Sequence, residues 1–363
     1  MAHDVLADKP DMVVHHHHPF NGELAPHRLD DPITPTARLF VRNNGDLPQR
    51  ARDQNPDGWT LTIDGEVERP RSWTLDELHA LPSVTLPLVL ECAGNGRTLF
   101  DPPVPGTPWQ LGAVGCCEWT GVPLAHLLDT VGVLPSAVYT AHYGEDEGVR
   151  GRERFSRGIP IAKALEEHTL VAYALNGEPL PAYHGYPARL IVPGWIGSCS
   201  QKWLSRIWIR DRVHDSERMS GYAYRMPDRP VAPGERPPKS AMEIATECRV
   251  KALITRPAAE VRVGVDQPVR VAGHAWAGER QVSTVRISID RGTTWTEATL
   301  TPPPNRYAWA RFEASIRFSA AGPAEIWAQA IDDRGDAQPI EQPWNPEGYL
   351  GNGVQRLPIL VDG

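Results

Sequence analysis

The feature that most constrains the fold is a proline-dense stretch about two-thirds of the way along the chain. Residues 227–240 read PDRPVAPGERPPKS and contain no periodic apolar positions. Proline lacks a backbone N–H and fixes φ, so neither a helix nor a central strand runs through such a segment. Because 363 residues are enough for two domains, we predict a linker over residues 226–244 that divides the chain into two parts.

The part before the linker, residues 37–225, has the pattern of a mixed α/β domain. Thr74 and Glu77 form a capping box ahead of one helix, and Pro123 opens another helix that Gly132 ends. Short apolar runs between the helical stretches predict strands. These runs are residues 59–63, 84–90, 138–143, 189–192 and 203–209.

Residues 1–36 are rich in Pro, Asp and His and show little periodicity, so we expect an extended arm across the surface. Four adjacent histidines, residues 15–18, lie in this arm. We assign them no metal site, because consecutive side chains point apart and no acidic or cysteine partner is near.

The part after the linker, residues 245–363, has the pattern of an immunoglobulin-like β-sandwich. Short runs of alternating residues are separated by Gly, Pro, Asn or Asp, which is the spacing of such a domain. The seven runs are residues 259–265, 268–276, 283–290, 294–300, 308–316, 324–332 and 356–361. Cys248 is the only cysteine in this part, so the usual Cys…Trp…Cys core is missing. The whole chain is predicted to be of the α+β class.

Charge and composition exclude several classes of function. The net charge is −8 and Lys and Arg form no run, which argues against a protein that binds nucleic acid or a membrane surface. No apolar run is long enough to span a bilayer and the first residues lack the pattern of a signal peptide, so we expect a soluble, cytoplasmic protein. The commonest nucleotide-binding, zinc-hydrolase and serine-hydrolase motifs are also absent.

The segment that is most informative about chemistry is residues 90–97, which read LECAGNGR. Its apolar strand ends on Cys92 and enters a glycine-rich turn, which exposes the thiol beside Arg97. A neighbouring guanidinium favours the thiolate, and a thiolate is a suitable ligand for a soft metal. Taken alone, the pattern is more typical of a cysteine that is buried as a small apolar residue.

This segment resembles the CAGN(R/G)R motif of the sulfite oxidase family, in which the cysteine ligates molybdenum. The resemblance covers nearly the whole chain, with several motifs in the family's order. The other matching segments are residues 19–23 (PFNGE), 33–35 (ITP), 40–44 (FVRNN), 184–189 (HGYPAR), 192–194 (VPG) and 202–204 (KWL). The chain is therefore identified as a member of this family, which implies a molybdopterin-binding domain and a C-terminal sandwich that forms a homodimer.

The resemblance implies a molybdenum centre that is held by one molybdopterin, by terminal oxygens and by the thiolate of Cys92. It implies no haem in this chain, since the HPGG motif does not occur, and hence electron transfer to an external acceptor such as a cytochrome c. The phosphate of the pterin needs charged donors in fixed geometry. The residues carried over for cofactor binding are Val41, Arg42, Asn43, Asn44, Asp146, His184, Arg189, Ser200, Gln201 and Lys202.

Around the metal, the family uses a cationic substrate pocket and a tyrosine. The residues carried over as catalytic are Arg97, Arg42, Trp109, Tyr224 and Arg311, with Tyr222 as a competitor for Tyr224. Electrostatics supports the arginines independently, because a dianionic substrate that approaches a protein of net charge −8 needs a local cationic region.

The function that the resemblance implies is oxidation of sulfite to sulfate by oxygen-atom transfer. Two departures bear on the substrate: Asn44 stands where the family usually has histidine, and ECAGNGR differs from the CAGNRR of animal and plant enzymes. Asparagine keeps hydrogen-bonding capacity but does not titrate near neutral pH. One alternative is a molybdopterin oxidoreductase of the same fold that acts on another oxyanion or on a sulfur or nitrogen oxide. Another, of a different class, is a cofactor-free β-sandwich binding protein.

Overall fold

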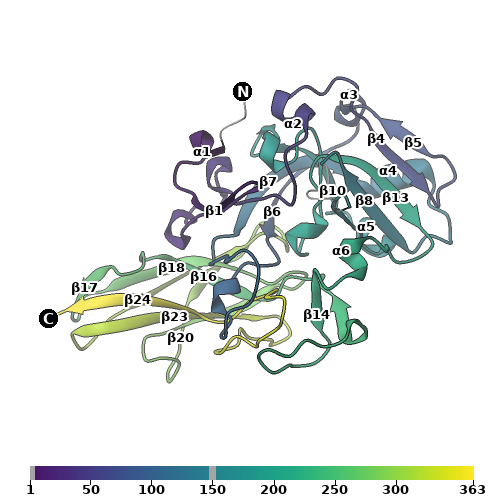
Figure 1. The fold of residues 1–363 in the computed structure, drawn as a ribbon. Coiled ribbons are helices and arrows are strands. Elements are labelled where there is room, and N and C mark those ends of the chain that lie inside the picture. The colour runs from purple at the N-terminus through teal and green to yellow at the C-terminus, as the bar shows by residue number, and fades with distance from the viewer. Residues whose placement is uncertain (1–4, 147–152) are drawn as a thin grey trace.

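The computed structural model describes residues 5–146 and 153–363. Figure 1 shows two bodies: an N-terminal region of sheets and short helices, drawn purple to teal, and a C-terminal sandwich of long strands, drawn green to yellow. The predicted α+β class is confirmed. Among the residues described, no helix has the length and apolar character that a membrane span requires.

Residues 5–42 form a small folded unit and not the extended arm that we expected. Strands β1 and β2 pair as a hairpin to which β3 adds; the elements are α1 (Val5–Asp8), β1 (Val13–His17), β2 (Phe20–Glu23) and β3 (Val41–Arg42). The Lys9 ammonium is buried and donates to two backbone carbonyls of the loop before β3. The Glu23 carboxylate accepts from the backbone N–H groups of Gln110 and Gly112 at 2.7 and 2.8 Å. These contacts are long-range, so they leave no periodic pattern in the sequence.

Two five-stranded sheets make up most of the N-terminal region. In the first sheet the order is β11-β10-β7-β6 and β12 also pairs with β10; its strands are β6 (Val84–Glu91), β7 (Val114–Pro123), β10 (Leu170–Leu175), β11 (Glu178–Pro179) and β12 (Arg189–Ile191). In the second the order is β5-β4-β13-β8-β9; its strands are β4 (Leu61–Gly65), β5 (Arg71–Trp73), β8 (Tyr139–Gly144), β9 (Ser156–Arg157) and β13 (Leu204–Arg210). Each of the five predicted runs coincides with a strand to within two residues.

Short helices connect these strands. The capping box of Thr74 and Glu77 is complete, and α4 ends at Gly132, which has a φ of 68°. Both local predictions are therefore confirmed. Besides α1, the α-helices are α2 (Gln49–Asp53), α3 (Leu75–His79), α4 (Leu124–Val131), α5 (Ile161–Ala164) and α6 (Glu217–Ser220). The 3-10 helices are η1 (Pro26–Arg28), η2 (Thr36–Arg38), η3 (Arg97–Leu99), η4 (Ala182–His184), η5 (Gly197–Cys199) and η6 (Lys239–Ala241).

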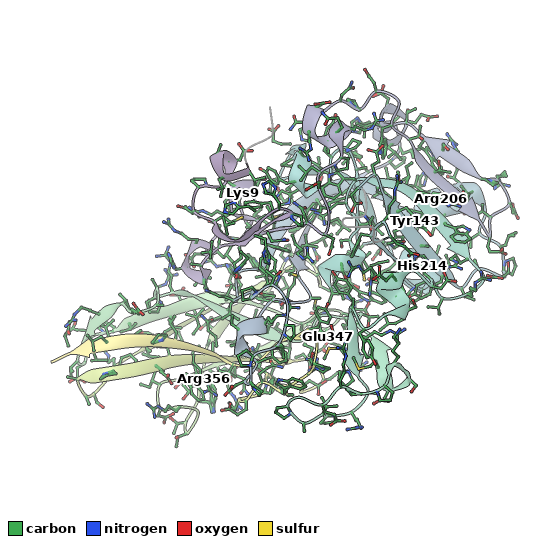
Figure 2. The ribbon with its side chains drawn as sticks, in the orientation of Figure 1. Lys9, Tyr143, Arg206, His214, Glu347 and Arg356 are labelled. Carbon is green, nitrogen blue, oxygen red and sulfur yellow. The ribbon has the colours of Figure 1, made fainter. Side chains whose placement is uncertain are left out.

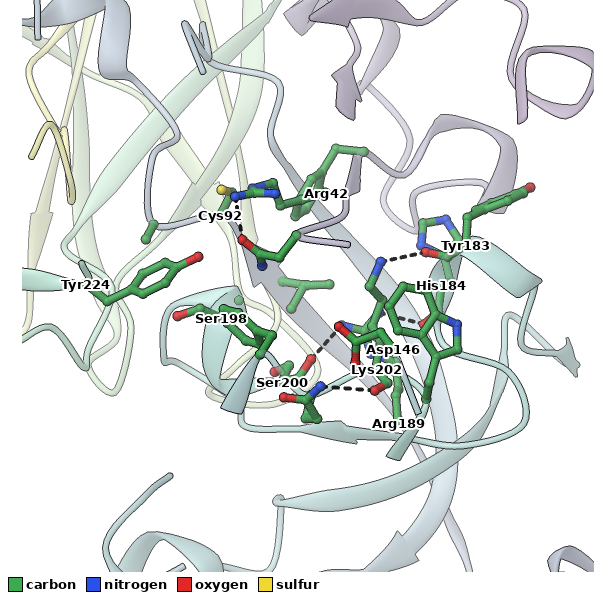
Figure 3. A pocket seen from close by; sticks show the side chains of 18 residues that line it. Arg42, Cys92, Asp146, Tyr183, His184, Arg189, Ser198, Ser200, Lys202 and Tyr224 are labelled. Atoms are coloured by element: carbon green, nitrogen blue, oxygen red, sulfur yellow. Dashed lines mark hydrogen bonds between the residues drawn. The ribbon is translucent and has the colours of Figure 1, made fainter. Parts of the chain in front are cut away.

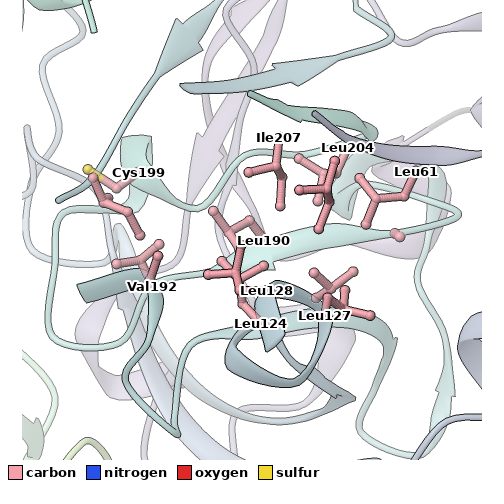
Figure 4. Packing of buried hydrophobic residues seen from close by; sticks show 14 of the residues in the cluster. Leu61, Leu124, Leu127, Leu128, Leu190, Val192, Cys199, Leu204 and Ile207 are labelled. Atoms are coloured by element: carbon pink, nitrogen blue, oxygen red, sulfur yellow. The ribbon is translucent and has the colours of Figure 1, made fainter. Parts of the chain in front are cut away.

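The main core of this region is built from the sheets and α4 (Figure 4). Leu124, Leu127 and Leu128 share one face of α4, at the spacing of an amphipathic helix. They belong to one buried cluster with Leu190 of β12 and Ile207 of β13. Each fully buried Leu contributes about 2 kcal/mol relative to an exposed one, so this cluster holds the strands that carry the site.

The proline-dense segment is a loop that is closed at its base. Its ends pair as two antiparallel strands, β14 (Arg225–Pro227) and β15 (Met242–Ile244). The chain therefore returns to the point at which it left the N-terminal region before it enters the sandwich.

The C-terminal region forms the predicted immunoglobulin-like sandwich. One sheet has the order β16-β18-β22-β21, with β16 (Lys251–Arg256), β18 (Val269–Trp276), β21 (Thr299–Thr301) and β22 (Ala310–Ile316). The other has the order β17-β24-β23-β19-β20, with β17 (Arg262–Gly264), β19 (Val282–Ser288), β20 (Thr296–Glu297), β23 (Gly322–Asp332) and β24 (Gln355–Asp362). All seven predicted runs overlap a strand. Strand β16 was missed because it is buried on both faces and its residues do not alternate.

A buried ion pair joins the two bodies. Lys251, at the start of β16, contacts the carboxylate of Glu91, at the end of β6, and both side chains are 5% exposed. The same carboxylate accepts from Trp276 Nε1 at 2.7 Å and from Asn95 Nδ2 at 2.9 Å. Glu91 directly precedes Cys92, so the sandwich helps to fix the strand end on which the candidate metal ligand lies.

Candidate active site

Cys92 follows β6 and opens the predicted turn. Its N–H donates to the carbonyl of Ala113 and its carbonyl accepts from the N–H of Asn95, both at 2.9 Å. Burial raises the pKa of the Cys92 thiol, against the positive charges of Arg42 and Arg97. The sequence led us to expect that Arg97 would favour the thiolate, but burial outweighs it. A thiolate here needs more positive charge than the arginines supply, and a metal cation bound to Cys92 would supply it.

Cys92 lines a cavity that we call the cofactor cavity (Figure 3). Figure 3 shows Arg42, Cys92 and Tyr224 toward one end and His184 and Lys202 toward the other. Most residues that the sequence predicted for cofactor binding line this cavity. They are Arg42, Asn44, Asp146, His184, Arg189, Ser200, Gln201 and Lys202.

Several buried polar atoms around the cofactor cavity lack a hydrogen-bond partner within the described part of the chain. They are Asn43 Nδ2, Asp146 Oδ1, His184 Nε2, Arg189 Nε, Ser198 Oγ and Gln201 Oε1. Such atoms are rare in folded proteins, because an unpaired buried polar group costs about 1–3 kcal/mol. The set contains donors and acceptors, which fits a ligand with both kinds of group, such as a pterin. The residues present therefore fit the implied cofactor.

The end of the cavity far from Cys92 is cationic. Lys202 Nζ donates to the carbonyl of Tyr183 at 2.9 Å, and the Arg189 guanidinium donates to the carbonyls of His184 and Ser200 at 2.9 and 3.1 Å. Burial lowers the pKa of Lys202 well below its ordinary value and that of Arg189 to about 9. Two desolvated cations side by side are suited to a phosphate group.

Asp146 and His184 lie at the same end, and burial disfavours the charged form of each side chain. Burial raises the pKa of Asp146 to about 6, against the positive charge of Lys202. Burial, together with the charges of Lys9, Arg189 and Lys202, lowers the pKa of His184 well below its ordinary value. A neutral imidazole can donate and accept, and a carboxyl group can accept or, once protonated, donate. Both side chains can therefore bond the polar edge of a pterin.

A second cavity of about 280 Å³ adjoins the first, and we call it the substrate cavity. Cys92, Arg42 and Tyr224 line both cavities. Arg97 and Trp109, which the sequence predicted for the substrate pocket, line the second one. Cys92 therefore lies where the two cavities meet.

Arg97 is held in the wall of the substrate cavity. Its Nη1 donates to the carbonyl of Thr107 at 2.8 Å and its Nη2 to the carbonyl of Glu347 at 3.3 Å. The guanidinium carbon lies 5.3 Å from the centre of the Tyr349 ring. The side chain is 8% exposed, so its charge is fixed in place.

Three glycines make room for this guanidinium. A Cβ at Gly94, Gly106 or Gly348 would lie 2.8–2.9 Å from an atom of the Arg97 side chain. Gly94 belongs to the motif that follows Cys92, so the turn needs glycine there to let Arg97 fold back over it. A larger residue would displace the cation.

Of the two candidate tyrosines, the structure places Tyr224 at the site. Tyr224 is buried, has a φ of 58° and stacks on Tyr349 with ring centroids 5.2 Å apart. The Tyr222 hydroxyl donates to the carbonyl of Pro237 at 3.4 Å, and its ring lies under Arg236 of the proline-dense loop. Tyr222 lines neither cavity.

Trp109 forms another wall of the substrate cavity and is buried. Its ring centroid lies 5.0 Å from that of His15 and 6.3 Å from that of Phe40, both edge to face. His15 also contacts the Glu23 carboxylate at 2.7 Å. The N-terminal hairpin therefore supports this wall.

Three predicted residues, Val41, Asn43 and Arg311, line neither cavity. Asn43 lies beside the cofactor cavity, where its Oδ1 accepts from Lys202 Nζ. Arg311, on β22, is 3.9 Å from the Asp30 carboxylate and lines neither cavity. Val41 is buried in the core near the N-terminal hairpin. The structure corrects the placement of Arg311 in the substrate pocket: the sandwich reaches the site through the connection between β23 and β24, which carries Glu347 and Tyr349.

Sequence reasoning missed several lining residues. Ser198 and Tyr183 line the cofactor cavity, and their closeness in sequence to the HGYPAR and VPG motifs could have suggested them. Glu347 and Tyr349 line the substrate cavity. Their surroundings, residues 345–353, are rich in Gly and Asn and predict only a turn.

The chain is similar to known proteins over most of its length. Residues 45–218 match the model of the oxidoreductase molybdopterin binding domain, and residues 242–361 match that of the Mo-co oxidoreductase dimerisation domain. Mitochondrial sulfite oxidase from Mus musculus is 30% identical over 99% of this chain and 68% of its own length. The NADH nitrate reductase of Ulva prolifera is 32% identical over 94% of this chain and 42% of its own length.

Among solved structures, the sulfane dehydrogenase SoxCD from Paracoccus pantotrophus superimposes with a TM-score of 0.79 at 28% identity. The match covers 93% of this chain and 83% of that one. Mitochondrial sulfite oxidase from Drosophila melanogaster is 31% identical over 94% of this chain. The chain spans 62% of the length of that relative and less of the nitrate reductases.

Proposed function

Because the chain belongs to the sulfite oxidase family of molybdopterin oxidoreductases, we propose that it oxidises sulfite to sulfate at a molybdopterin centre in the cofactor cavity. The position of Cys92 at the junction of the two cavities carries the proposal. Cys92, a soft ligand, has the cofactor cavity on one side and the substrate cavity, which Arg42 and Arg97 line, on the other. When bound, the cofactor supplies a two-electron oxidation with transfer of an oxygen atom.

The residues of the cofactor cavity hold the group in this proposal. Lys202 and Arg189 bind its phosphate with charge-assisted hydrogen bonds, which are worth about 1.5–3 kcal/mol each. The unpartnered atoms of His184, Asp146 and Gln201 supply further donors and acceptors. The Cys92 thiolate is the protein's ligand to the metal.

In the substrate cavity, Arg97 binds and orients the anion. Its guanidinium is tied to two backbone carbonyls and therefore requires no reorganisation during the reaction. Arg42 lines both cavities and adds a second positive charge. Tyr224 also lines this cavity, and in this proposal its hydroxyl donates to a substrate oxygen and holds a proton as electrons leave.

The proposal includes the setting in which the enzyme works. Electrons leave to an external acceptor such as a cytochrome c, and the C-terminal sandwich pairs two copies of the chain. The match of residues 242–361 to a dimerisation domain supports the second point. We also propose that the enzyme works in the cytoplasm. Light scattering tests the dimer, and fractionation of cells tests the location.

A second candidate is turnover of another oxyanion or of a sulfur or nitrogen oxide. The nitrate reductase match favours it, since that relative is as similar to this chain as the sulfite oxidases are. Asn44, in the place where the family usually has histidine, also bears on the substrate. Its side-chain oxygen accepts from Arg42 Nη2 at 2.7 Å, so it acts on the cation that lines both cavities.

One experiment separates these functions. The protein is purified from a host that makes the cofactor, its molybdenum is measured, and turnover is assayed with sulfite and an electron-accepting dye. Nitrate and a sulfoxide are assayed in parallel with a reduced dye. Molybdenum near one atom per chain with turnover on sulfite supports the proposal. Turnover only on nitrate or the sulfoxide favours the second candidate, and protein purified from that host without molybdenum contradicts both.

A further inference from the structure

The substrate cavity contains a carboxylate that the proposed sulfite chemistry does not call for. We infer that Glu347 sets the charge of the substrate, so that the site accepts anions with one negative charge, or neutral molecules, in preference to dianions. This inference rests on the proposed function only for the identity of the site. It makes Glu347 a residue that determines specificity.

Glu347 belongs to the sandwich but lies at the site. It is on the connection between β23 and β24, and Figure 2 shows it near the junction between the sandwich and the N-terminal region. Its carbonyl accepts from Arg97 Nη2 at 3.3 Å, and its side chain, 21% exposed, lines the cavity with Arg97, Arg42 and Cys92. An incoming anion therefore meets this carboxylate together with the two cations.

The partner of this carboxylate is a weak one. Arg236 Nη2 lies 3.5 Å from Glu347 Oε1, and the Arg236 side chain is 62% exposed on the proline-dense loop. Exposed ion pairs are screened by water and contribute little. Burial raises the pKa of Glu347, while Arg236 and Arg97 act against it. Among the described residues that line the cavity, two arginines therefore face one acidic side chain.

The rest of the cavity also suits a weakly charged substrate. Trp109, Tyr224 and Tyr349 present aromatic rings to it. Arg42 is already engaged, since it donates to Asn21 Oδ1 at 3.3 Å and to Asn44 Oδ1 at 2.7 Å. A dianion would therefore face one firmly placed cation, a second cation shared with asparagines, and a repelling carboxylate. In this site sulfite is expected to bind as its hydrogen sulfite monoanion.

The test compares two anions that share a tetrahedral sulfur and differ by one charge. Binding of sulfate and of methanesulfonate to the purified holoenzyme is measured by calorimetry for the wild type and for Glu347→Gln. Glu341→Gln is the matched control, because it removes the same charge from the same connection at a side chain that is 82% exposed. Molybdenum content is measured for every sample.

The two anions should respond in a fixed ratio. Repulsion between a carboxylate and an anion is proportional to the anion's charge, so its free energy is twice as large for a dianion. The factor by which Kd changes for the dianion is therefore the square of the factor for the monoanion. We expect Glu347→Gln to lower the Kd of sulfate about tenfold and that of methanesulfonate about threefold. Glu341→Gln should change neither. Equal changes for both anions, or none, in molybdenum-replete protein would overturn the inference.

A second variant covers the case in which Glu347→Gln does not fold. Arg236→Gln removes the exposed cation that partly neutralises the carboxylate and leaves the cavity wall intact. It should weaken sulfate binding about twofold and methanesulfonate binding less; tighter or unchanged sulfate binding counts against the inference. The proposed function can fail separately, because absence of sulfite turnover in molybdenum-replete wild type leaves the comparison of the two anions valid.

Discussion

Replacing Lys202 by Met should have opposite effects on the cofactor-free and the loaded protein. Lys202 Nζ donates to the Tyr183 carbonyl at 2.9 Å and lies 4.3 Å from the centre of the Trp203 ring. Burial and the nearby Arg189 hold its pKa well below the ordinary 10.5, although Asp146 acts in the other direction. Folding therefore forces a cation into a place where it is disfavoured, unless an anion is bound there.

The size of each effect follows from these contacts. In the cofactor-free protein, Met removes a desolvated charge, a gain of about 3 kcal/mol, and loses two hydrogen bonds, to the Tyr183 carbonyl and to Asn43 Oδ1, about 1 kcal/mol each. Lys202→Met should thus raise the free energy of unfolding by about 1 kcal/mol at pH 7. A group whose folded pKa is lowered costs stability below its unfolded pKa, so the gain should shrink as the pH approaches 10.5. In the loaded protein, cofactor retention should fall by about 1.5–3 kcal/mol per lost charge-assisted bond.

The assay is urea unfolding of protein from a host that lacks molybdopterin synthesis, set beside molybdenum and pterin content of protein from a host that has it. Lys239→Met is the matched control, since Lys239 is exposed on the proline-dense loop. A lower free energy of unfolding of the cofactor-free variant would refute the reasoning and would assign Lys202 to a structural ion pair with Asp146.

Three further outcomes are expected. Cys92→Ser should keep the fold and abolish sulfite turnover, because oxygen is a harder ligand, whereas Cys116→Ser should keep turnover; the reverse result in a dye assay would mean that the wrong cysteine was chosen. Arg97→Gln should retain molybdenum and lose about 2–4 kcal/mol of transition-state binding, roughly a 30- to 1000-fold fall in kcat/KM; unchanged kinetics would place the anion pocket elsewhere. Burial lowers the pKa of His214 to about 4, so its contribution to stability is present above pH 6.5 and about 3 kcal/mol is lost as the pH falls from 6.5 to 4. In urea titrations, the free energy of unfolding of His214→Gln should fall less steeply between pH 6.5 and 4 than that of the wild type. An identical slope would contradict this.

The hydrogen bonds of His214 explain that last expectation. Arg210 Nη1 lies 2.9 Å from its Nδ1, which must therefore accept, so Nε2 carries the proton and faces Ser156 Oγ at 2.8 Å. Burial disfavours the protonated form most, and a second proton on the ring would also face the Arg210 guanidinium.

Local patterns made much of the site predictable. Cys92 and Arg97 share one turn, and the spacing of Gly94 between them is what lets the guanidinium fold back. Arg189 belongs to the motif at the start of β12, and Lys202 to the motif just before β13. Both strands were also predicted correctly. In each case the residues that cooperate are close in sequence.

The residues that the sequence did not predict make their contacts with residues that are distant in sequence. Glu347 meets Arg97 across 250 positions, and the hairpin of residues 5–42 packs through single long-range contacts such as that of Glu23 with Gly112. No local period marks such residues. Arg311 was misplaced for the same reason, since an arginine on a strand of the sandwich looks the same in sequence whether it pairs with Asp30 or faces a substrate.

The buried contact of Lys251 with Glu91 has a consequence for the way the chain unfolds. Separating the sandwich from the N-terminal region would break this ion pair and would expose the apolar surface around it to water, which costs about 25 cal/mol for each Å² of apolar area. Glu91 would also lose its bond to Trp276. The two bodies should therefore melt in a single cooperative transition and resist separation by limited proteolysis. A fragment that ends in the proline-dense loop should be an aggregating chain and not a minimal enzyme.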